Sequence, residues 1–384
     1  MVNTLDPHSA YMPPDMYREM QVDTKGEFGG LGIQIGIKDN RLMVIAPIEG
    51  TPADRAGVKA GDAIAEIEGA STKNMTLMDA VNKLRGPKGT KVTLTLRRDG
   101  QAAPIRVTLT RETIKIQSVK SEMLPDQIGY VRLSQFQEQT GDDLKQALKR
   151  LVDDKAQALI LDLRNNPGGL LTAAVDVSEQ FLQKGKMVVS IRGRSGTVEE
   201  YHANGGTPLV DVPMIILVNA GSASASEIVA GALQDWGRAV VLGTTTFGKG
   251  SVQTIIALSD GAGLRLTTAK YFTPKERSIH AVGIVPDIVV EGKEDKGHRV
   301  MREQDLLRRL ENGGGEEFPP ADGAGDGGKP PAQPEPEPPQ GSAGDLQLAK
   351  AVELLKSWKI FKSVVPPAGM PSVAESENAQ KIIK

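Results

Sequence analysis

The chain has 384 residues, with 46 lysines and arginines against 48 aspartates and glutamates, so its formal net charge at pH 7 is −2. This balance argues against a general nucleic-acid-binding protein, which needs a basic surface, and an aromatic content of 4% argues against base stacking. The chain contains no cysteine, which excludes thiolate catalysis, disulfides and zinc–cysteine sites.

The length predicts two or three domains. No run of about 18 apolar residues occurs, so no integral membrane segment is expected. Residues 1–25 include Pro7, Pro13 and Pro14 and predict irregular structure or a short helix. They lack a basic start followed by an apolar core, so no signal peptide is expected within this chain. We interpret residues 1–25 as the N-terminal segment of a core whose beginning is truncated.

Residues 26–112 predict a compact, β-rich domain. Apolar residues alternate as they do in strands over 31–37, 92–96 and 105–109. A helical spacing over 77–84 ends at a Gly-Pro pair, because proline cannot continue a helix.

Two segments of this region resemble a PDZ domain: the turn Gly30-Leu-Gly-Ile33 and the segment Thr51–Asp62. The resemblance implies that Gly30, Leu31, Gly32 and Ile33 bind the carboxylate of a peptide C-terminus. Consecutive backbone N–H groups in a glycine turn can form an anion-binding nest, and an exposed strand edge beside it can accept an extended peptide. The alternative interpretation is a glycine-rich hairpin without a ligand.

Residues 113–292 predict a second domain of the α/β class. Apolar strands of the kind buried on both faces of a sheet alternate with helical segments, and such alternation argues for stacked βα units. We expect strands at 128–133, 158–163, 187–191, 214–218 and 239–242, helices at 142–152, 170–182 and 224–235, and an antiparallel addition at 252–258 and 264–269.

Three segments follow this core. Residues 293–311 are charged and predict a helix up to Leu310, and residues 312–343 are rich in Gly, Pro, Glu and Asp, which predicts a disordered linker. Residues 344–384 predict a helix over 346–355 and a flexible tail. Two interpretations of that helix stay open: a docking or oligomerisation element, and a marginal helix exposed to solvent.

The chemistry of the chain converges on residues 219–253. Ser222, Ser224 and Ser226 lie in a turn of small residues that leads into a helix, and Lys249 follows between two glycines. A serine and a lysine can form a nucleophile and its general base without histidine. This chemistry also needs a group that orients the lysine amine, and Gln253 can supply it. It further needs an oxyanion hole of backbone N–H groups. Gly168 or Gly169, with the N–H after the nucleophile, can provide the hole.

Two other interpretations apply to the same residues. The segment Gly243–Lys249 fits part of a phosphate-binding loop, but Gly250 stands where the motif needs Ser or Thr, and a strand rather than a helix is expected next. A Ser-His-Asp triad through His280 is the second. We interpret His8, within the segment Asp6–Tyr11, as structural. His202, His280 and His298 have no acidic partner at a telling spacing, and no cluster has metal-ligand spacing, so no metal or other cofactor is proposed.

The chain resembles the C-terminal processing proteases, also called tail-specific proteases, which are Ser/Lys peptidases with a PDZ domain. The motifs that carry the resemblance are Asp6–Tyr11, Gly26–Ile33, Asp162–Gly169, Gly221–Glu227 and Phe247–Gln253. The resemblance implies that Ser224 is the nucleophile, Lys249 the general base and Gln253 the residue that orients the lysine. It implies oxyanion donors at the backbone of Ala225 and of Gly168 or Gly169. It also implies a crotonase-like βα core with the PDZ domain inserted near its N-terminal part.

The expected function is therefore a serine endopeptidase that captures the C-terminus of a protein substrate and cleaves it through an acyl-enzyme. The expected partners are proteins with extended or unfolded C-termini, an adaptor protein, and further copies of the full-length chain in a homo-oligomer. The resemblance implies export to the periplasm. The competing interpretation is a PDZ binding scaffold on a catalytically inactive crotonase-like domain.

Overall fold

The computed structural model describes residues 2–206, 208, 210–292, 301–311 and 344–364. The expected linker at 312–343, the tail at 365–384, residues 293–300 and His298 lie outside these residues. The chain divides into two compact units, one formed by Met1–Tyr17 with Ser118–Lys384 and the other by Arg18–Gln117. The second unit is an insertion in the first, and the expected PDZ segment 26–112 falls inside it.

The second unit is built on a sheet with the strand order β3-β4-β5-β7-β8, in which β6 pairs with β5. A separate pair is formed by β2 and β9. The strands are β2 (Glu27–Gly30), β3 (Ile33–Lys38), β4 (Arg41–Pro47), β5 (Ala63–Ile67), β6 (Ala70–Ser71), β7 (Lys91–Arg97), β8 (Ile105–Thr110) and β9 (Glu112–Lys115). The helices are α2 (Pro52–Arg55) and α3 (Leu77–Leu84). Helix α3 starts where predicted because Thr76 and Asp79 form a capping box.

The first unit contains a six-stranded sheet with the order β10-β11-β12-β15-β16-β19. Strands β10 and β11 are antiparallel, and the pairs from β11 to β19 are parallel. The strands are β10 (Val119–Leu124), β11 (Ile128–Leu133), β12 (Ala158–Asp162), β15 (Met214–Val218), β16 (Val240–Gly243) and β19 (Ile288–Val289). Every residue of β12 and β15 is buried, as the apolar runs predict.

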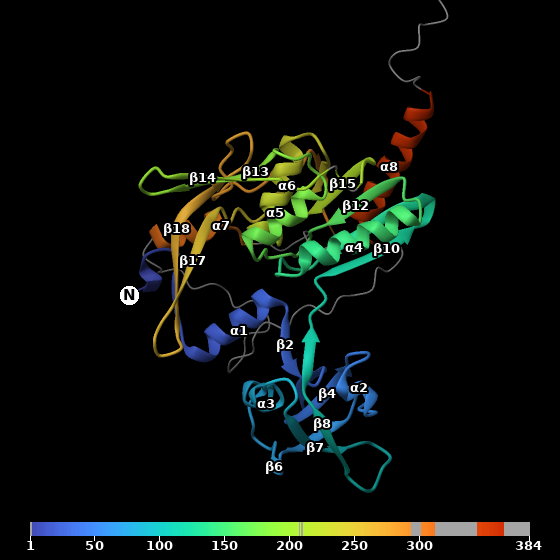
Figure 1. The fold of residues 1–384 in the computed structure, drawn as a ribbon, viewed down its shortest axis with the longest axis vertical. Coiled ribbons are helices and arrows are strands. Elements are labelled where there is room, and N and C mark those ends of the chain that lie inside the picture. Colours follow the sequence, from blue (N-terminus) through green and yellow to red (C-terminus); the bar gives the residue numbers. More distant parts are fainter. Residues whose placement is uncertain (1, 207, 209, 293–300, 312–343, 365–384) are drawn as a thin grey trace, which may run out of the picture. The chain divides into compact units, whose positions relative to one another are not determined.

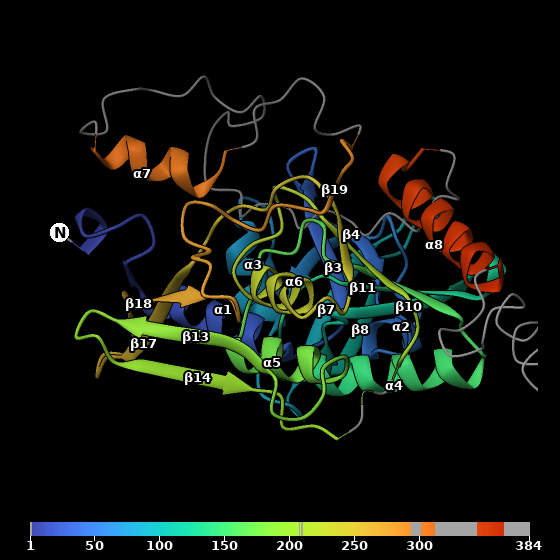
Figure 2. The same ribbon diagram turned by 90° about the horizontal axis from the view of Figure 1, so that it is seen from above.

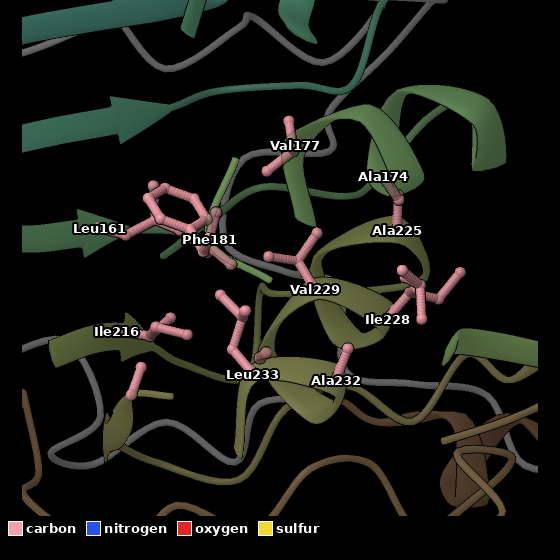
Figure 3. Packing of buried hydrophobic residues seen from close by; sticks show 14 of the residues in the cluster. Leu161, Ala174, Val177, Phe181, Ile216, Ala225, Ile228, Val229, Ala232 and Leu233 are labelled. Atoms are coloured by element: carbon pink, nitrogen blue, oxygen red, sulfur yellow. The ribbon is translucent and has the colours of Figure 1, made fainter. Parts of the chain in front are cut away.

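Helices cover both faces of this sheet. Side chains alternate between the faces along a strand, so Leu159 and Leu161 pack with α4 (Thr140–Asp153), α5 (Leu171–Glu179) and α6 (Ala225–Asp235), whereas Ile160 packs with α8 (Leu346–Val364). Figure 2 shows α8 and α4 on opposite sides of β10 and β11. Figure 3 shows the first of these cores, where α6 packs against the sheet residues Leu161 and Ile216.

The helix predicted at 346–355 extends to Val364 and docks on the sheet. Leu348, Ala351 and Leu355 are buried against a cluster that includes Ile160 and Leu217. Burying one leucine side chain fully stabilises a fold by roughly 1.5–3 kcal/mol. The solvent-exposed alternative for this helix is therefore wrong.

A second sheet of this unit has the order β1-β18-β13-β14, and β17 pairs with β18. All of its pairs are antiparallel, and β17 and β18 lie side by side in Figure 1. The strands are β1 (Ala10–Met12), β13 (Met187–Gly193), β14 (Val198–His202), β17 (Ser251–Ala257) and β18 (Gly263–Phe272). The remaining helices are α1 (Pro14–Lys25), which crosses the boundary of the units, and α7 (Glu303–Glu311).

Candidate active site

Ser224 lies in the turn between β15 and α6, one residue before the helix begins. Its φ of 53° and ψ of −112° lie outside the regions that residues other than glycine usually adopt. Strain of this kind costs on the order of 1–3 kcal/mol and persists only where the surroundings hold it. Here the Ser224 N–H donates to Glu227 Oε2 at 2.8 Å, and the Ser224 carbonyl accepts from the N–H groups of Glu227 and Ile228. The main chain is thereby fixed at the candidate nucleophile.

The structure gives the three serines of this turn different surroundings. Ser222 is fully buried, and its hydroxyl donates to the Leu163 carbonyl at 2.8 Å. Ser226 is fully buried as well, and its hydroxyl donates to the Asn166 carbonyl at 2.9 Å. Ser224 is partly exposed. Two serines therefore brace the turn, and Ser224 is the one of the three that solvent reaches.

Lys249 lies in the loop between β16 and β17. Burial lowers the pKa of its amine below the ordinary value, and the charge of Arg265 lowers it further, whereas Glu303 and Glu227 act in the opposite direction. A lowered pKa increases the neutral fraction of the amine, and only the neutral amine can accept a proton. Among the described residues, no hydrogen bond joins this amine to the Ser224 hydroxyl in this conformation.

One buried carboxylate, that of Glu227, connects the serine turn with the lysine loop. Its Oε2 accepts hydrogen bonds from the N–H groups of Ser224 at 2.8 Å and of Lys249 at 2.9 Å. Its Oε1 accepts from the Gly248 N–H at 2.7 Å and from the Thr246 hydroxyl at 2.5 Å. Burial raises the pKa of Glu227 to about 7, although these hydrogen bonds favour the charged form. Glu227 therefore fixes the main chains of Ser224 and Lys249 to the same oxygen atom.

Glu227 belongs to the motif Gly221–Glu227, but the sequence alone predicts no role for it. The signal that was available is the spacing Ser224-x-x-Glu227, which is typical of a helix N-terminus. The contacts of Glu227 with residues 246–249 depend on the fold and carry no local signal.

Gln253 lies on β17, and only the nitrogen of its side-chain amide has hydrogen-bond partners among the described residues. Its Nε2 donates to Thr267 Oγ1 at 2.9 Å and to Ser251 Oγ at 3.2 Å. Its Oε1 is buried, and no described residue donates to it. The expectation that Lys249 and Gln253 share a strand face does not apply, because Lys249 precedes β17 and the register of β17 shifts between Val252 and Gln253. Gln253 thus presents a buried acceptor without a partner.

The glycines proposed for the oxyanion hole lie directly beside the serine turn. Gly168 has a φ of +100°, and a Cβ added to it would lie 2.8 Å from Ser224 Cβ and 2.9 Å from the Ala225 nitrogen. Gly169 has a φ of +145°, and its Cβ would lie 2.0 Å from the Phe136 carbonyl oxygen. Both positions therefore require glycine. The Gly168 N–H donates to Asn166 Oδ1 at 2.9 Å, whereas no described residue accepts from the Gly169 N–H.

The structure also bears on the phosphate-binding loop, on the histidines and on a metal site. Lys249 is followed by strand β17 and not by a helix, which contradicts a phosphate-binding loop. His202 Nε2 lies 3.5 Å from Glu200 Oε2, so the expectation that His202 lacks an acidic partner is wrong. His8, which was expected to be structural, has its Nε2 2.8 Å from Glu303 Oε2. His280 Nδ1 lies 3.9 Å from Glu303 Oε1, and no described residue forms a hydrogen bond with it. Within the described ranges no group of three or more His, Cys, Asp or Glu could hold a metal ion.

The two units match two known domain families. Residues 127–290 match Peptidase family S41, and residues 19–97 match the PDZ domain. These matches define the class of the protein as a serine-type peptidase with a PDZ domain, and they confirm the expected fold of an α/β core with an inserted PDZ domain. No helix in the described part of the chain is long and apolar enough to span a membrane.

Several proteins are similar to the chain over most of its length. It is 45% identical over 375 residues to a carboxy-terminal-processing protease of Bartonella bacilliformis, which covers 96% of this chain and 83% of that protein. It is 45% identical over 298 residues to a carboxyl-terminal-processing protease of Synechocystis sp., with 76% and 69% covered. A solved structure of the photosystem II D1 C-terminal processing protease matches with a TM-score of 0.46 and 33% identity, over 74% of this chain and 78% of that one. The chain therefore belongs to the carboxy-terminal processing proteases of family S41.

Proposed function

We propose that this chain is an endopeptidase that recognises the C-terminus of a protein substrate through its PDZ domain and cleaves with Ser224 as nucleophile and Lys249 as general base. The observation that carries this proposal is the Glu227 carboxylate, which binds the backbone N–H groups of both residues. A buried carboxylate with four hydrogen bonds is a costly feature to build unless both loops must be held together.

The proposed reaction uses the side chains of Ser224, Lys249 and Gln253. The neutral Lys249 amine takes the proton of the Ser224 hydroxyl while Oγ bonds to the carbonyl carbon of the peptide. Lys249 then gives the proton to the leaving amine, and an ester on Ser224 remains. Water then attacks the ester carbon while it gives a proton to Lys249, and Lys249 passes this proton to Ser224 Oγ as the C–O bond breaks and the acid leaves. Gln253 Oε1 accepts a hydrogen bond from the lysine amine, which aims the nitrogen lone pair at Ser224.

The negative oxygen of the tetrahedral intermediate needs N–H donors. The Ala225 N–H lies at the start of α6, where the helix dipole favours negative charge. The second donor comes from Gly168 or Gly169. The Gly169 N–H is available in this conformation, and use of the Gly168 N–H requires that its bond to Asn166 Oδ1 break.

The features of the PDZ unit fit capture of an extended peptide. Among the described residues, β3 pairs only with β4, so its outer edge is open, and α3 contacts β3. Gly32 has a φ of +74°, and a Cβ there would lie 2.3 Å from Thr51 side-chain atoms, so the loop beside β3 requires glycine. A peptide added to this edge would place its carboxylate at the N–H groups of Gly30–Ile33. Proteins with extended or unfolded C-termini are therefore the proposed substrates.

The test is cleavage of a disordered protein by Ser224→Ala, with Ser195→Ala, an exposed serine outside the site, as the control. Ser224→Ala is expected to lose cleavage and to keep binding of a C-terminal peptide, and Ser195→Ala is expected to keep both. Cleavage by Ser224→Ala at the wild-type rate would contradict the assignment of the nucleophile.

A second candidate function is a PDZ scaffold on an inactive core, and the missing hydrogen bond between Ser224 and Lys249 in this conformation is the observation that favours it. A serine-directed fluorophosphonate separates the two. Labelling of the wild type that is lost in Lys249→Ala supports the enzyme, and absence of labelling in the wild type supports the scaffold.

We also propose that the protein acts in the periplasm and that the full-length form is a homo-oligomer that works with an adaptor protein. The support is the membership in this family, since the relatives from Bartonella bacilliformis and Synechocystis sp. are bacterial. Cell fractionation tests the first point: recovery with cytoplasmic markers alone would contradict it. Sedimentation of the full-length chain tests the second, since a monomer at all concentrations would contradict it.

A further inference from the structure

The segment Asp6–Ser9 belongs to the motif Asp6–Tyr11 and takes no part in the proposed reaction steps. It precedes β1, which pairs with β18 through Ala10 and Arg265. Its main chain and side chains bind β18 directly: Arg265 Nε donates to the His8 carbonyl at 2.9 Å, and the Thr267 N–H donates to Ser9 Oγ at 3.1 Å. The N-terminal segment is therefore fixed to the strand that borders Gln253.

The Asp6 carboxylate also joins this segment to β18, and it does so as a hydrogen-bond acceptor. Its Oδ1 accepts from the N–H groups of His8 and Ser9 at 2.9 Å each and from the Thr267 hydroxyl at 2.8 Å, and its Oδ2 accepts from the Ser9 hydroxyl. Burial alone would raise the pKa of Asp6, but these hydrogen bonds hold it below the ordinary value. Asp6 is thus a carboxylate that only accepts hydrogen bonds.

The direction of the hydrogen bonds follows from this charge. A hydroxyl has one proton, and Thr267 gives its proton to Asp6, so toward Gln253 the Thr267 oxygen can only accept. The Gln253 amide must then turn its NH₂ group to Thr267 and Ser251. Its Oε1 consequently points the other way, buried and without a donor among the described residues.

We propose that Asp6 and Thr267 are positioning residues, which act through a directed hydrogen-bond chain that orients the Gln253 amide so that its oxygen faces Lys249. This inference rests on the proposed function of Ser224 and Lys249. Without Asp6 the Thr267 hydroxyl is free to donate to Gln253, the amide can turn over, and an NH₂ group then replaces the acceptor. An NH₂ group cannot accept a hydrogen bond from the lysine amine.

The neighbouring threonine on β18 offers a matched control. Thr268 is exposed, and its hydroxyl pairs with the hydroxyl of Thr254 on β17 at 2.8 Å. It lies on the same strand as Thr267 and makes the same kind of cross-strand hydrogen bond, but it points to the other face of the sheet, and no hydrogen bond joins it to Gln253 among the described residues. Thr267→Val and Thr268→Val therefore remove the same group, and only the first breaks the chain to Gln253.

The experiment is a double-mutant cycle with kcat and KM measured for cleavage of a disordered protein. Thr267→Val and Asp6→Ala are each expected to lower kcat roughly 10- to 100-fold with little change in KM, since misplacement of a catalytic group by about 1 Å costs up to this factor. Thr267→Ser is expected to restore kcat, and Thr268→Val to leave it unchanged. In the Gln253→Ala background, Thr267→Val and Asp6→Ala are expected to cause no further loss, because residues that act through one group are not additive.

Two outcomes would overturn the inference. One is that Thr267→Val behaves like Thr268→Val, and the other is that Thr267→Val and Asp6→Ala lower kcat by the same factor with and without Gln253. If one of the two variants fails to fold, judged by its thermal unfolding, the cycle with the other decides. Failure of the proposed function is distinguishable, because Ser224→Ala and Lys249→Ala would then cleave like the wild type.

Discussion

The charge state of Lys249 links the geometry of the site to a measurable property. Burial and Arg265 lower the pKa of the amine, and the carboxylates of Glu303 and Glu227 limit this decrease. The amine is protonated and inactive as a base below its pKa, and it is neutral above it. The proposed mechanism therefore requires that activity rise with pH.

We predict that kcat of the wild type increases as the pH rises through the lowered pKa of Lys249 and reaches its plateau below the ordinary lysine value of about 10.4. Lys249→Arg is expected to lose on the order of 10²- to 10⁴-fold in kcat, because a guanidinium stays protonated. Lys270→Arg, at an exposed position on β18, is the control and should keep the profile. A wild-type rate that falls with rising pH over this range would refute the role of Lys249 as a base.

For the residues of the site, the sequence identified the residue types but not their contacts. The pattern left Ser222, Ser224 and Ser226 open as nucleophiles, because their difference lies in which carbonyl each hydroxyl meets, and those carbonyls belong to residues 163 and 166. The role of Glu227 and the directed chain to Gln253 were not predictable either. Both join segments that are distant in sequence, and a periodic pattern reports only neighbours along one element.

Among the elements, strands and helices with a strong period were predicted within a few residues. The apolar runs at 158–163 and 214–218 are β12 and β15, because a strand buried on both faces is almost continuously apolar. Strand β14 (Val198–His202) was not predicted, since it is an edge strand whose side chains are largely exposed and polar. Strand β1 was not predicted because three residues carry too little of a period, and its pairing with β18 places it.

The turn at Gly168 gives a prediction at the level of one element. In Gly168→Ala the Cβ would meet the Ala223 carbonyl oxygen, Ser224 Cβ and the Ala225 nitrogen within 3 Å, so the turn must move away from the serine. We expect a loss of roughly 10²-fold or more in kcat, the cost of a lost oxyanion donor. The measurement is kcat beside the free energy of unfolding from urea titration.

Gly185→Ala is the matched control for this variant. Gly185 also has a positive φ, of +82°, but a Cβ there would meet no atom within 4 Å. It should lose about 1 kcal/mol of stability from backbone strain and keep its kcat. Equal kcat values for the two variants would contradict the placement of Gly168 at the site.

For the whole molecule, the insertion of Arg18–Gln117 into the core is the feature that the sequence alone could indicate through the resemblance but not through periodicity. The matches to the PDZ domain and to Peptidase family S41 confirm these two components. The function of the two domains together depends on whether the PDZ domain binds the C-terminus of the substrate.

We predict that amidation of a substrate's C-terminus lowers kcat/KM about 10-fold or more, because it removes the negative charge that the loop Gly30–Ile33 is proposed to bind. The control is the same substrate with an acetylated N-terminus and a free C-terminus, which should be cleaved like the parent. Equal kcat/KM for the free acid and the amide would contradict recognition of the C-terminal carboxylate.

The proposed mechanism is tested most directly by finding the residue to which the substrate is attached during cleavage. Wild-type enzyme is mixed with a peptide substrate, quenched in acid within milliseconds to seconds, digested and analysed by mass spectrometry. We expect the N-terminal part of the cleaved peptide as an ester on Ser224, absent in Ser224→Ala and strongly reduced in Lys249→Ala. An acyl group on another residue, or cleavage by the wild type without any acyl-enzyme in this time range while the Ser224→Ala variant also cleaves, would contradict it.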